Sequence, residues 1–304
     1  MVLFNTLIPV FALILLGYLV GWKRWVPAEA GGSLAAVTFK LLLPALLFAG
    51  LARADLEGGF TPLLILVYYV PALLIFAGVN LWAQHRLKRP TSMGLASSYS
   101  NNVLVGIPLV SMLLGPQGLV YLFAILIFHS PLLFAAQSLY NGLFPAAGGS
   151  RLSGRALVAS LANPIIVGLL LGVALNLSGL DLPAPLWRTI DWLGAAALPC
   201  ALLVLGLSLS SYRLTMSKSL VALTLVKLVV FPSMMLAAVL LANGLPAQAQ
   251  AVMVIMAACP TGVNVLAFAM GGEDNRIISS VICLSTLAAV LTLPAWLWVL
   301  ERMV

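Results

Sequence analysis

Apolar residues run through this chain in long blocks that short polar stretches interrupt. Most blocks are as long as the roughly 20 apolar residues that a helix needs to cross a lipid bilayer. The pattern predicts ten transmembrane helices, joined by connections too short to hold a soluble domain. The expected spans are residues 2–21, 33–51, 61–82, 92–114, 118–139, 157–177, 187–210, 218–241, 247–270 and 276–300.

The second half of the chain repeats landmarks of the first half. Pro9 recurs as Pro164, 155 positions later, and the spacing grows to 163 between Pro131 and Pro294. Five spans in each half explain these repeated residues. Because five is an odd number, the second copy has the opposite orientation in the bilayer, as in many secondary transporters. We therefore predict an all-α polytopic membrane protein built from two inverted five-helix repeats. The expected parts are repeat 1 (1–139), a cytoplasmic linker (140–156) and repeat 2 (157–304).

Composition also favours a membrane protein, because 62% of the residues are hydrophobic and only 8% are charged. The net charge of +7 does not indicate nucleic acid, since the 15 basic residues are scattered over short loops and two spans. Ten of them fall in loops after odd-numbered spans and three on the opposite side, which places both termini outside a bacterial-type cytoplasmic membrane. The ten are Lys23, Arg24, Arg86, Lys88, Arg89, Arg151, Arg155, Arg213, Lys218 and Arg276, and the three are Arg53, Arg188 and Arg302.

The fourth and ninth spans contain polar residues and helix breakers near mid-membrane, over residues 97–108 and 259–264. Backbone without helical hydrogen bonds is tolerated in a bilayer only where it is buried in protein or lines a water-filled cavity. The two breaks are therefore expected to cross, with half-helix N-termini that attract a carboxylate. The alternative, that the amides only join helices, stays open. The predicted substrate-binding residues are Ser100, Asn101, Asn102, Gly106, Lys227, Pro260, Thr261 and Asn264.

No aspartate or glutamate lies near the middle of a predicted span. A site without acids is neutral or positive, which favours an anionic substrate over a cationic one. Lys227 lies nine positions after Lys218 and is expected to face the protein interior. There it could neutralise a substrate carboxylate or carry a coupling proton. Lys40 and His129 are the two other coupling candidates.

Sequence motifs of catalysis are missing from the chain. It contains no H-E-x-x-H pair, no G-x-S-x-G elbow and no G-x-x-x-x-G-K-[ST] loop. We therefore expect no enzyme, no cofactor and no metal, and transport driven by a gradient or a partner chain. The spacings Gly17 to Gly21 and Gly168 to Gly172 fit the G-x-x-x-G pattern of close helix packing.

The run Asn101-Asn102-Val103-Leu104-Val105-Gly106-Ile107-Pro108 resembles a signature of the auxin efflux carrier family, whose bacterial members are described as transporters of malonate, malate and similar acids. Similar signatures follow in family order along the whole chain, at residues 43–48, 227–232, 258–260 and 284–294. The resemblance implies a scaffold of spans 1, 2, 6 and 7, a transport domain of spans 3–5 and 8–10 that moves as an elevator, and a homodimer.

The same resemblance assigns Asn101 as the carboxylate-binding asparagine and Pro260 as the crossing proline. The chain departs from the plant carriers at Ser100, where they have proline, and at Thr261, where they have glutamine. The family pattern pairs Ser100 with Pro260, at an offset of 160, whereas the repeated Asn-Val-Leu gives an offset of 162. Which amides face each other therefore stays open.

The sequence thus predicts a secondary transporter of small organic anions, such as malonate, malate or auxin-like acids, that works by elevator-type alternating access. Its partners would be the anion, a coupling proton or sodium ion, and the lipid bilayer. One alternative is a sodium-coupled symporter resembling the bile-acid family, with a cation site built from Asn, Ser and Thr oxygens. Another is a gated anion channel, or a receptor that binds its ligand without moving it.

Overall fold

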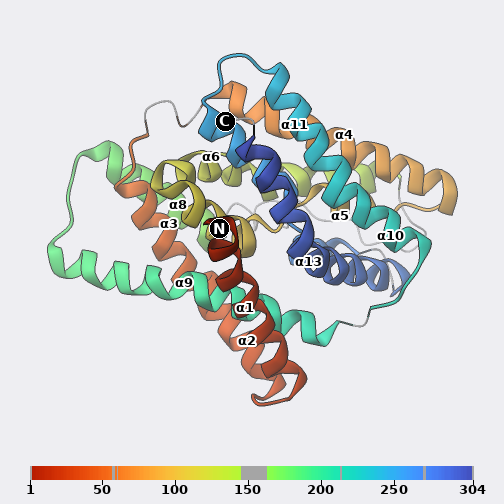
Figure 1. Cartoon of the computed structure of the whole chain (residues 1–304), viewed down its shortest axis with the longest axis horizontal. Coiled ribbons are helices and arrows are strands. Elements are labelled where there is room, and N and C mark those ends of the chain that lie inside the picture. Colours follow the sequence, from red (N-terminus) through yellow and green to blue (C-terminus); the bar gives the residue numbers. More distant parts are fainter. Residues whose placement is uncertain are drawn as a thin grey trace. The chain divides into compact units, whose positions relative to one another are not determined.

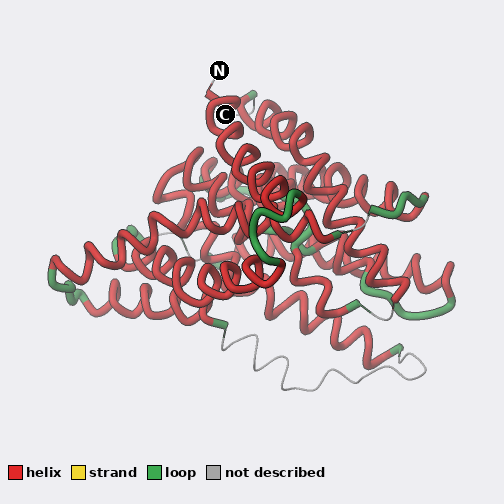
Figure 2. The backbone as a smooth tube through the Cα atoms, turned by 90° about the horizontal axis from the view of Figure 1, so that it is seen from below, coloured by secondary structure: helices red, strands yellow, loops and turns green. Residues whose placement is uncertain are grey.

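The computed structural model describes residues 2–56, 59, 61–144, 163–212, 214–269 and 272–302. Helices make up most of this part of the chain, and it contains no strand (Figure 2). The chain is thus an all-α membrane protein, and its described residues include six helices long and apolar enough to span a bilayer. These six are Glu29–Ala52, Pro62–Leu87, Asn102–Leu143, Ala184–Ser211, Lys218–Leu241 and Gly272–Glu301, and three shorter apolar helices are Leu7–Trp22, Pro164–Ser178 and Ala247–Ala258.

The chain divides into two compact units that alternate along the sequence. The first unit consists of Met1–Phe60, Val103–Ile127 and Ala159–Ser211, and the second of Thr61–Asn102, Phe128–Val158 and Tyr212–Val304. Each unit therefore draws its helices from both halves of the sequence.

In the first unit, α1 packs along α9 and α3 packs along α8 (Figure 1). α8 begins at Pro164, a residue suited to the first turn because it has no N–H to satisfy there. The Asn163 side chain caps this helix by accepting the N–H of Ile165 at 3.0 Å. The elements are α1 (Val2–Trp22), α2 (Ala28–Val37), the π-helix η1 (Thr38–Leu42), α3 (Leu43–Ala52), α8 (Pro164–Ser178) and α9 (Ala184–Ser211).

Glycines let the backbones of these helix pairs approach closely. A Cβ atom on Gly17 would meet the carbonyl oxygen of Leu203 in α9. A Cβ atom on Gly168 would lie 2.7 Å from the carbonyl oxygen of Pro44 in α3. The G-x-x-x-G spacings seen in the sequence therefore serve packing within this unit.

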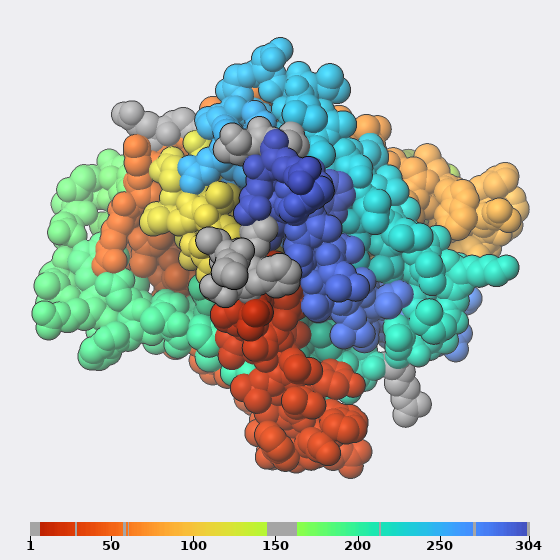
Figure 3. Space-filling model, viewed as in Figure 1, coloured from red at the N-terminus to blue at the C-terminus, as the bar shows by residue number. Residues whose placement is uncertain are grey.

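In the second unit, α10, η3 and α11 form one helix over Lys218–Leu241, as the apolar block at 218–241 predicts. The side chains of α13 lie directly against those of α10 and η3 (Figure 3). The elements are α4 (Pro62–Leu87), α5 (Met93–Ser98), α10 (Lys218–Leu225), the π-helix η3 (Val226–Val230), α11 (Phe231–Leu241), α12 (Ala247–Ala258), the 3₁₀ helix η4 (Val263–Phe268) and α13 (Gly272–Glu301).

The π-helix η2 (Asn102–Gly106) and α6 (Ile107–Leu143) form a run of 42 residues. At about 1.5 Å per residue this run is roughly twice as long as the ~30 Å hydrocarbon core. Gly115 interrupts it with a non-helical backbone (φ 63°, ψ −159°), close to the boundary predicted between spans four and five. α6 continues past the predicted end at 139, and residues 145–156 of the predicted linker lie outside the described residues.

Buried polar side chains hold α5 in place within the second unit. The Oδ1 atom of Asn80 in α4 accepts the N–H of Gly94 at 2.8 Å, and its Nδ2 donates to Gln137 Oε1 at 3.3 Å. Gln137 Nε2 in turn donates to the Thr91 carbonyl at 3.1 Å. Because each buried polar group in this chain of contacts has a partner, the network orients α5 and the residues that follow it.

Candidate functional site

The fourth and ninth predicted spans both break, at the positions where the sequence places polar residues. α12 ends at Ala258, because Pro260 has no N–H and forces Cys259 into extended backbone (φ −59°, ψ 147°). α5 ends at Ser98, and Tyr99 is likewise extended (φ −87°, ψ 109°). The second half of the ninth span differs from the expected half-helix, since only the six-residue 3₁₀ helix η4 follows the break.

The two extended segments pair with each other through their backbones. Ser100 and Thr261 form an antiparallel β-bridge, and the N–H of Asn101 donates to the Pro260 carbonyl at 2.7 Å. Pairing in this way satisfies backbone groups that have left their helices, which a bilayer requires. The pairing has an offset of 161, between the two offsets that the sequence left open. We call these two segments, residues 99–102 and 259–262, the crossing.

Gly262 is required at the crossing because the ring of Tyr99 lies on it. A Cβ atom at this position would lie 2.6 Å from two ring carbons of Tyr99. The ring has little room to move, since it stacks on Phe134 at 5.1 Å and its hydroxyl lies 2.7 Å from Ser130 Oγ. We expect Gly262→Ala to destabilise the protein by about 1–3 kcal/mol, measured as a lower unfolding temperature. Gly78→Ala is the control, because nothing lies within 4 Å of a Cβ there, and equal unfolding temperatures in the two variants would contradict this account.

Asn102 forms a buried polar cluster with Tyr68 and His129. Its Nδ2 donates to the Tyr68 hydroxyl at 3.2 Å and lies 3.4 Å from His129 Nε2, which is itself 3.3 Å from the Ser100 carbonyl. Asn102 Oδ1 and His129 Nδ1 are buried and find no hydrogen-bond partner among the described residues. Buried polar atoms are normally paired, so these two are candidates for contact with a ligand.

The other two predicted amides differ in their burial. Asn101 is 4% exposed, and its backbone is anchored to Pro260 as described above. Asn264 is exposed, and its Nδ2 lies 3.4 Å from the Tyr99 hydroxyl. Of the three predicted amides, Asn101 and Asn102 are therefore the interior ones, which makes them the stronger candidates for holding a carboxylate away from water.

Lys227 is fully buried, as its depth in the span predicts, and it contacts the crossing directly. Its ammonium group donates to Ser100 Oγ at 2.8 Å and to the Ala257 carbonyl at 2.7 Å. The Nζ atom also lies 4.8 Å from the centre of the Phe231 ring. Neither of the two ion pairs found among the described residues involves this lysine.

The remaining predicted residues fall into two groups. Thr261 belongs to the crossing, where its N–H donates to Ser285 Oγ at 3.1 Å and its hydroxyl to the Ala96 carbonyl at 2.8 Å. Gly106 is the last residue of η2, and Lys40 is an exposed residue of η1; both belong to the first unit. Lys40 thus lies in a different unit from the other coupling candidates, Lys227 and His129.

Three residues that belong to the crossing or contact it were not among the predicted site residues. Tyr99 and Ser285 lie inside segments that the sequence already singles out, so their positions carried a signal. Tyr68 had no such signal in the sequence, because a tyrosine in an apolar span is common. Its role became visible only through its contact with Asn102.

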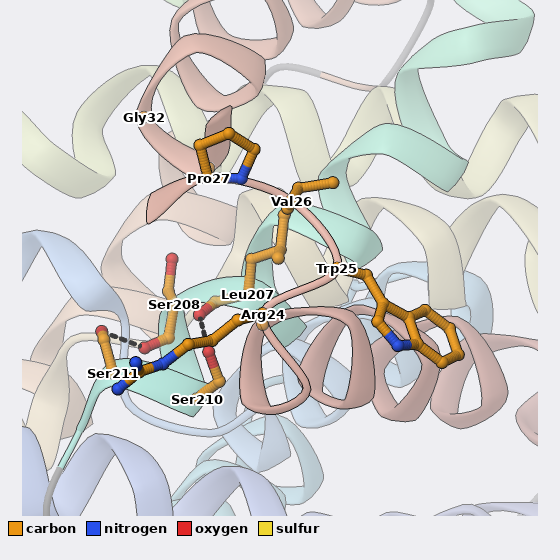
Figure 4. Close-up of a pocket in the computed structure, with 11 residues that line it drawn as sticks. Arg24, Trp25, Val26, Pro27, Gly32, Leu207, Ser208, Ser210 and Ser211 are labelled. Carbon is orange, nitrogen blue, oxygen red and sulfur yellow. Dashed lines mark hydrogen bonds between the residues drawn. The ribbon is translucent and has the colours of Figure 1, made fainter. Parts of the chain in front are cut away.

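A separate cavity of about 740 Å³ lies within the first unit, between the end of α1, the start of α2 and the end of α9 (Figure 4). Arg24 reaches into it toward Ser211, and Trp25 lies at its rim (Figure 4). Arg24 has a left-handed backbone (φ 54°), which is uncommon for residues other than glycine. None of the predicted substrate-binding residues lines this cavity.

A helical membrane protein in which two broken helices pair at buried amides has the construction of a membrane transporter. The chain belongs to the family described as "Membrane transport protein", whose sequence profile matches residues 2–135 and 150–297. This confirms the resemblance to the auxin efflux carrier family. The protein is therefore a membrane transporter and not an enzyme.

Three relatives align with nearly the whole chain. A protein of Rhizobium meliloti (strain 1021) named "Putative malonate transporter" is 30% identical, over 97% of this chain and 94% of the relative. An "Uncharacterized transporter" of Methanothermobacter thermautotrophicus is 31% identical, over 96% of both chains. The "Uncharacterized transporter YfdV" of Escherichia coli (strain K12) is 23% identical, again over 96% of both chains.

Proposed function

We propose that this protein is a secondary transporter that carries small carboxylates across the cytoplasmic membrane by alternating access. The observation that carries the proposal is the crossing, where two broken helices pair through Ser100 and Thr261 and the neighbouring amides Asn101 and Asn102 are buried in the protein interior. Transporters commonly bind substrate at such discontinuous helices near the bilayer midplane. The name of the Rhizobium relative supports a carboxylate, and malonate is the first compound to test.

The chemistry of the crossing suits an anion. Amide N–H groups donate hydrogen bonds to carboxylate oxygens, and the helical segment that begins at Asn102 and is interrupted at Gly115 directs its positive end toward the same place. Asp274, the buried acid among the described residues of the second unit, lies at the other end of α5, where its Oδ2 accepts the N–H of Ser92 at 3.2 Å. The crossing itself contains no Asp or Glu. A substrate carboxylate at Asn101 would therefore meet hydrogen-bond donors there and no carboxylate that repels it.

The proposal extends to the architecture and its motion. We take the ten predicted spans to be two inverted five-helix repeats with both termini outside, and the two units to be a scaffold and a moving transport domain. In support, the first unit contains predicted spans 1, 2, 6 and 7, and the second contains spans 3, 8, 9 and 10. Spans 4 and 5 are divided between the two units, since residues 103–127 belong to the first. An elevator motion of the second unit and a homodimer through the first complete this proposal.

The test is a counterflow measurement with the purified protein in liposomes. Liposomes loaded with unlabelled malonate should take up labelled malonate, with saturation and with competition by related carboxylates. Malonamide is the matched control, since it keeps the three-carbon skeleton and lacks the charge. Saturable counterflow would separate a carrier from a channel or a receptor. If no mono- or dicarboxylate is exchanged and none raises the unfolding temperature, the proposed substrate class is wrong.

A further inference from the structure

The helix that carries Lys227 has an unusual backbone just where it meets the crossing. Lys227 lies in the π-helical turn η3, and Pro232 follows in the next turn. Pro232 has no N–H to donate to the Leu228 carbonyl, and Trp296 Nε1 donates to that carbonyl instead at 2.8 Å. Wide π-helical turns often occur at functional sites. The position of Lys227 is thus set by two local departures from α-helix.

The hydrogen bonds of the crossing are asymmetric, and Lys227 causes the asymmetry. Ala96 and Ala257 are separated by the same 161 positions as Ser100 and Thr261, so the two pairs occupy equivalent places. On one side, the Thr261 hydroxyl donates directly to the Ala96 carbonyl at 2.8 Å. On the other side, the Lys227 ammonium lies between the Ser100 hydroxyl, at 2.8 Å, and the Ala257 carbonyl, at 2.7 Å. A positive charge is inserted where the first side has a direct hydrogen bond.

A positive charge at this place is stabilised by the end of a helix. Ala257 is the penultimate residue of α12, and the C-terminal end of a helix carries about half a negative charge on its unpaired carbonyls. The ammonium donates to one of these carbonyls and contacts the Phe231 ring, and neither ion pair of the described residues joins it to an acid. Its partners are therefore neutral oxygens and an aromatic face. Hydroxyl oxygens and the carbonyls at broken-helix ends are also the ligands that sodium ions find in many transporters.

We propose that the Lys227 ammonium is a built-in counter-cation of the crossing, which occupies the oxygen ligands that a sodium ion would otherwise bind. Lys227 is then a positioning residue and does not hold the carboxylate itself. The consequence for transport, which rests on the proposed function, is that this carrier moves its anion without sodium. The sodium-coupled alternative needs a cation site made of hydroxyl and carbonyl oxygens, and Lys227 already fills the one at the crossing.

The test compares three substitutions of Lys227 with the wild type. Lys227→Ala removes the ammonium and leaves room beside Ser100 and Ala257, Lys227→Met replaces the charge with an apolar chain, and Lys227→Arg keeps the charge. Unfolding temperatures are measured in sodium chloride and in N-methyl-D-glucamine chloride at equal ionic strength, and again with ethylammonium chloride. Ethylammonium restores the missing end of the side chain as a free molecule.

We expect the wild type to unfold at the same temperature in both salts. Lys227→Ala should unfold about 5–10 °C lower in N-methyl-D-glucamine, because a buried carbonyl and a helix end lose their cation, and should recover at least half of that loss in sodium or ethylammonium. The unfolding temperature of Lys227→Met should also be lowered, and sodium or ethylammonium should not restore it, since the methionine side chain fills the space. Recovery by small cations is a response that a purely structural lysine would not produce.

Two results would overturn the inference. One is a wild type that sodium stabilises or whose carboxylate uptake requires sodium. The other is a Lys227→Ala variant whose unfolding temperature is either unchanged or lowered equally in all salts. Should that variant not fold, loss of malonate counterflow in Lys227→Arg to the same extent as in Lys227→Met would also count against it. Failure of the wild type to exchange any carboxylate would remove the proposed function and leave the salt-dependent unfolding as a separate result.

Discussion

Replacing Asn101 by alanine is expected to remove most carboxylate transport while leaving the protein folded. Alanine keeps the backbone N–H that donates to the Pro260 carbonyl, so the two broken helices stay paired. What is lost is the side-chain amide and its hydrogen bonds to the substrate. Because a hydrogen bond to a charged group contributes about 1.5–3 kcal/mol, malonate uptake at low concentration should fall by about 10- to 150-fold.

The measurement needs an amide of the same kind outside the crossing. Asn243 is exposed in the turn between α11 and α12, so Asn243→Ala should transport like the wild type. Asn101→Asp is a second comparison, since its negative charge would repel the anion and should lower uptake further. Unchanged uptake by a folded Asn101→Ala variant would show that this amide does not bind the substrate.

Substituting Gly206 by alanine should destabilise the first unit more than any other single methyl group that we consider. A Cβ atom at Gly206 would meet the Ile14 carbonyl oxygen and would lie 2.7 Å from the Tyr18 amide nitrogen. Both atoms belong to the backbone of α1, so no side chain can rotate out of the way. We expect a loss of about 3 kcal/mol, seen as an unfolding temperature lower by roughly 5–10 °C in detergent.

Gly32→Ala is the matched control for this prediction, with an effect of the opposite sign. Gly32 lies inside α2, and nothing is within 4 Å of a Cβ built on it. Glycine inside a helix costs about 0.5–1 kcal/mol relative to alanine, so this variant should be slightly more stable than the wild type. If both variants unfold at the wild-type temperature, the contact between α1 and α9 is less close than described.

The helices themselves could be predicted because their causes are local. A block of apolar residues as long as a bilayer is thick becomes a helix wherever the chain enters lipid, and the block at 218–241 corresponds to α10, η3 and α11. Pro260 ends α12 for an equally local reason, the absence of an N–H group. The number of spans is different: within the described part of the chain six helices meet the length and composition of a span, and the count of ten stays a prediction.

The site was predicted less completely. The buried amides Asn101 and Asn102 stand out because polar groups are rare in apolar spans, and Lys227 stands out for the same reason. The register of the crossing could not be deduced, since a single β-bridge between Ser100 and Thr261 depends on where two distant segments meet. Tyr68 was missed because nothing near it in the sequence is polar enough to draw attention.

By itself, the sequence determined that this is a helical membrane protein of the transporter class, with breaks at two defined places. Hydrophobic length and proline chemistry act within a few neighbouring residues, so they can be read along the chain. The tertiary structure alone decided the partners of Lys227, a hydroxyl 127 positions away and a backbone carbonyl 30 positions away. A backbone carbonyl has no sequence signature, because every residue carries one and only folding decides which of them meets a buried charge.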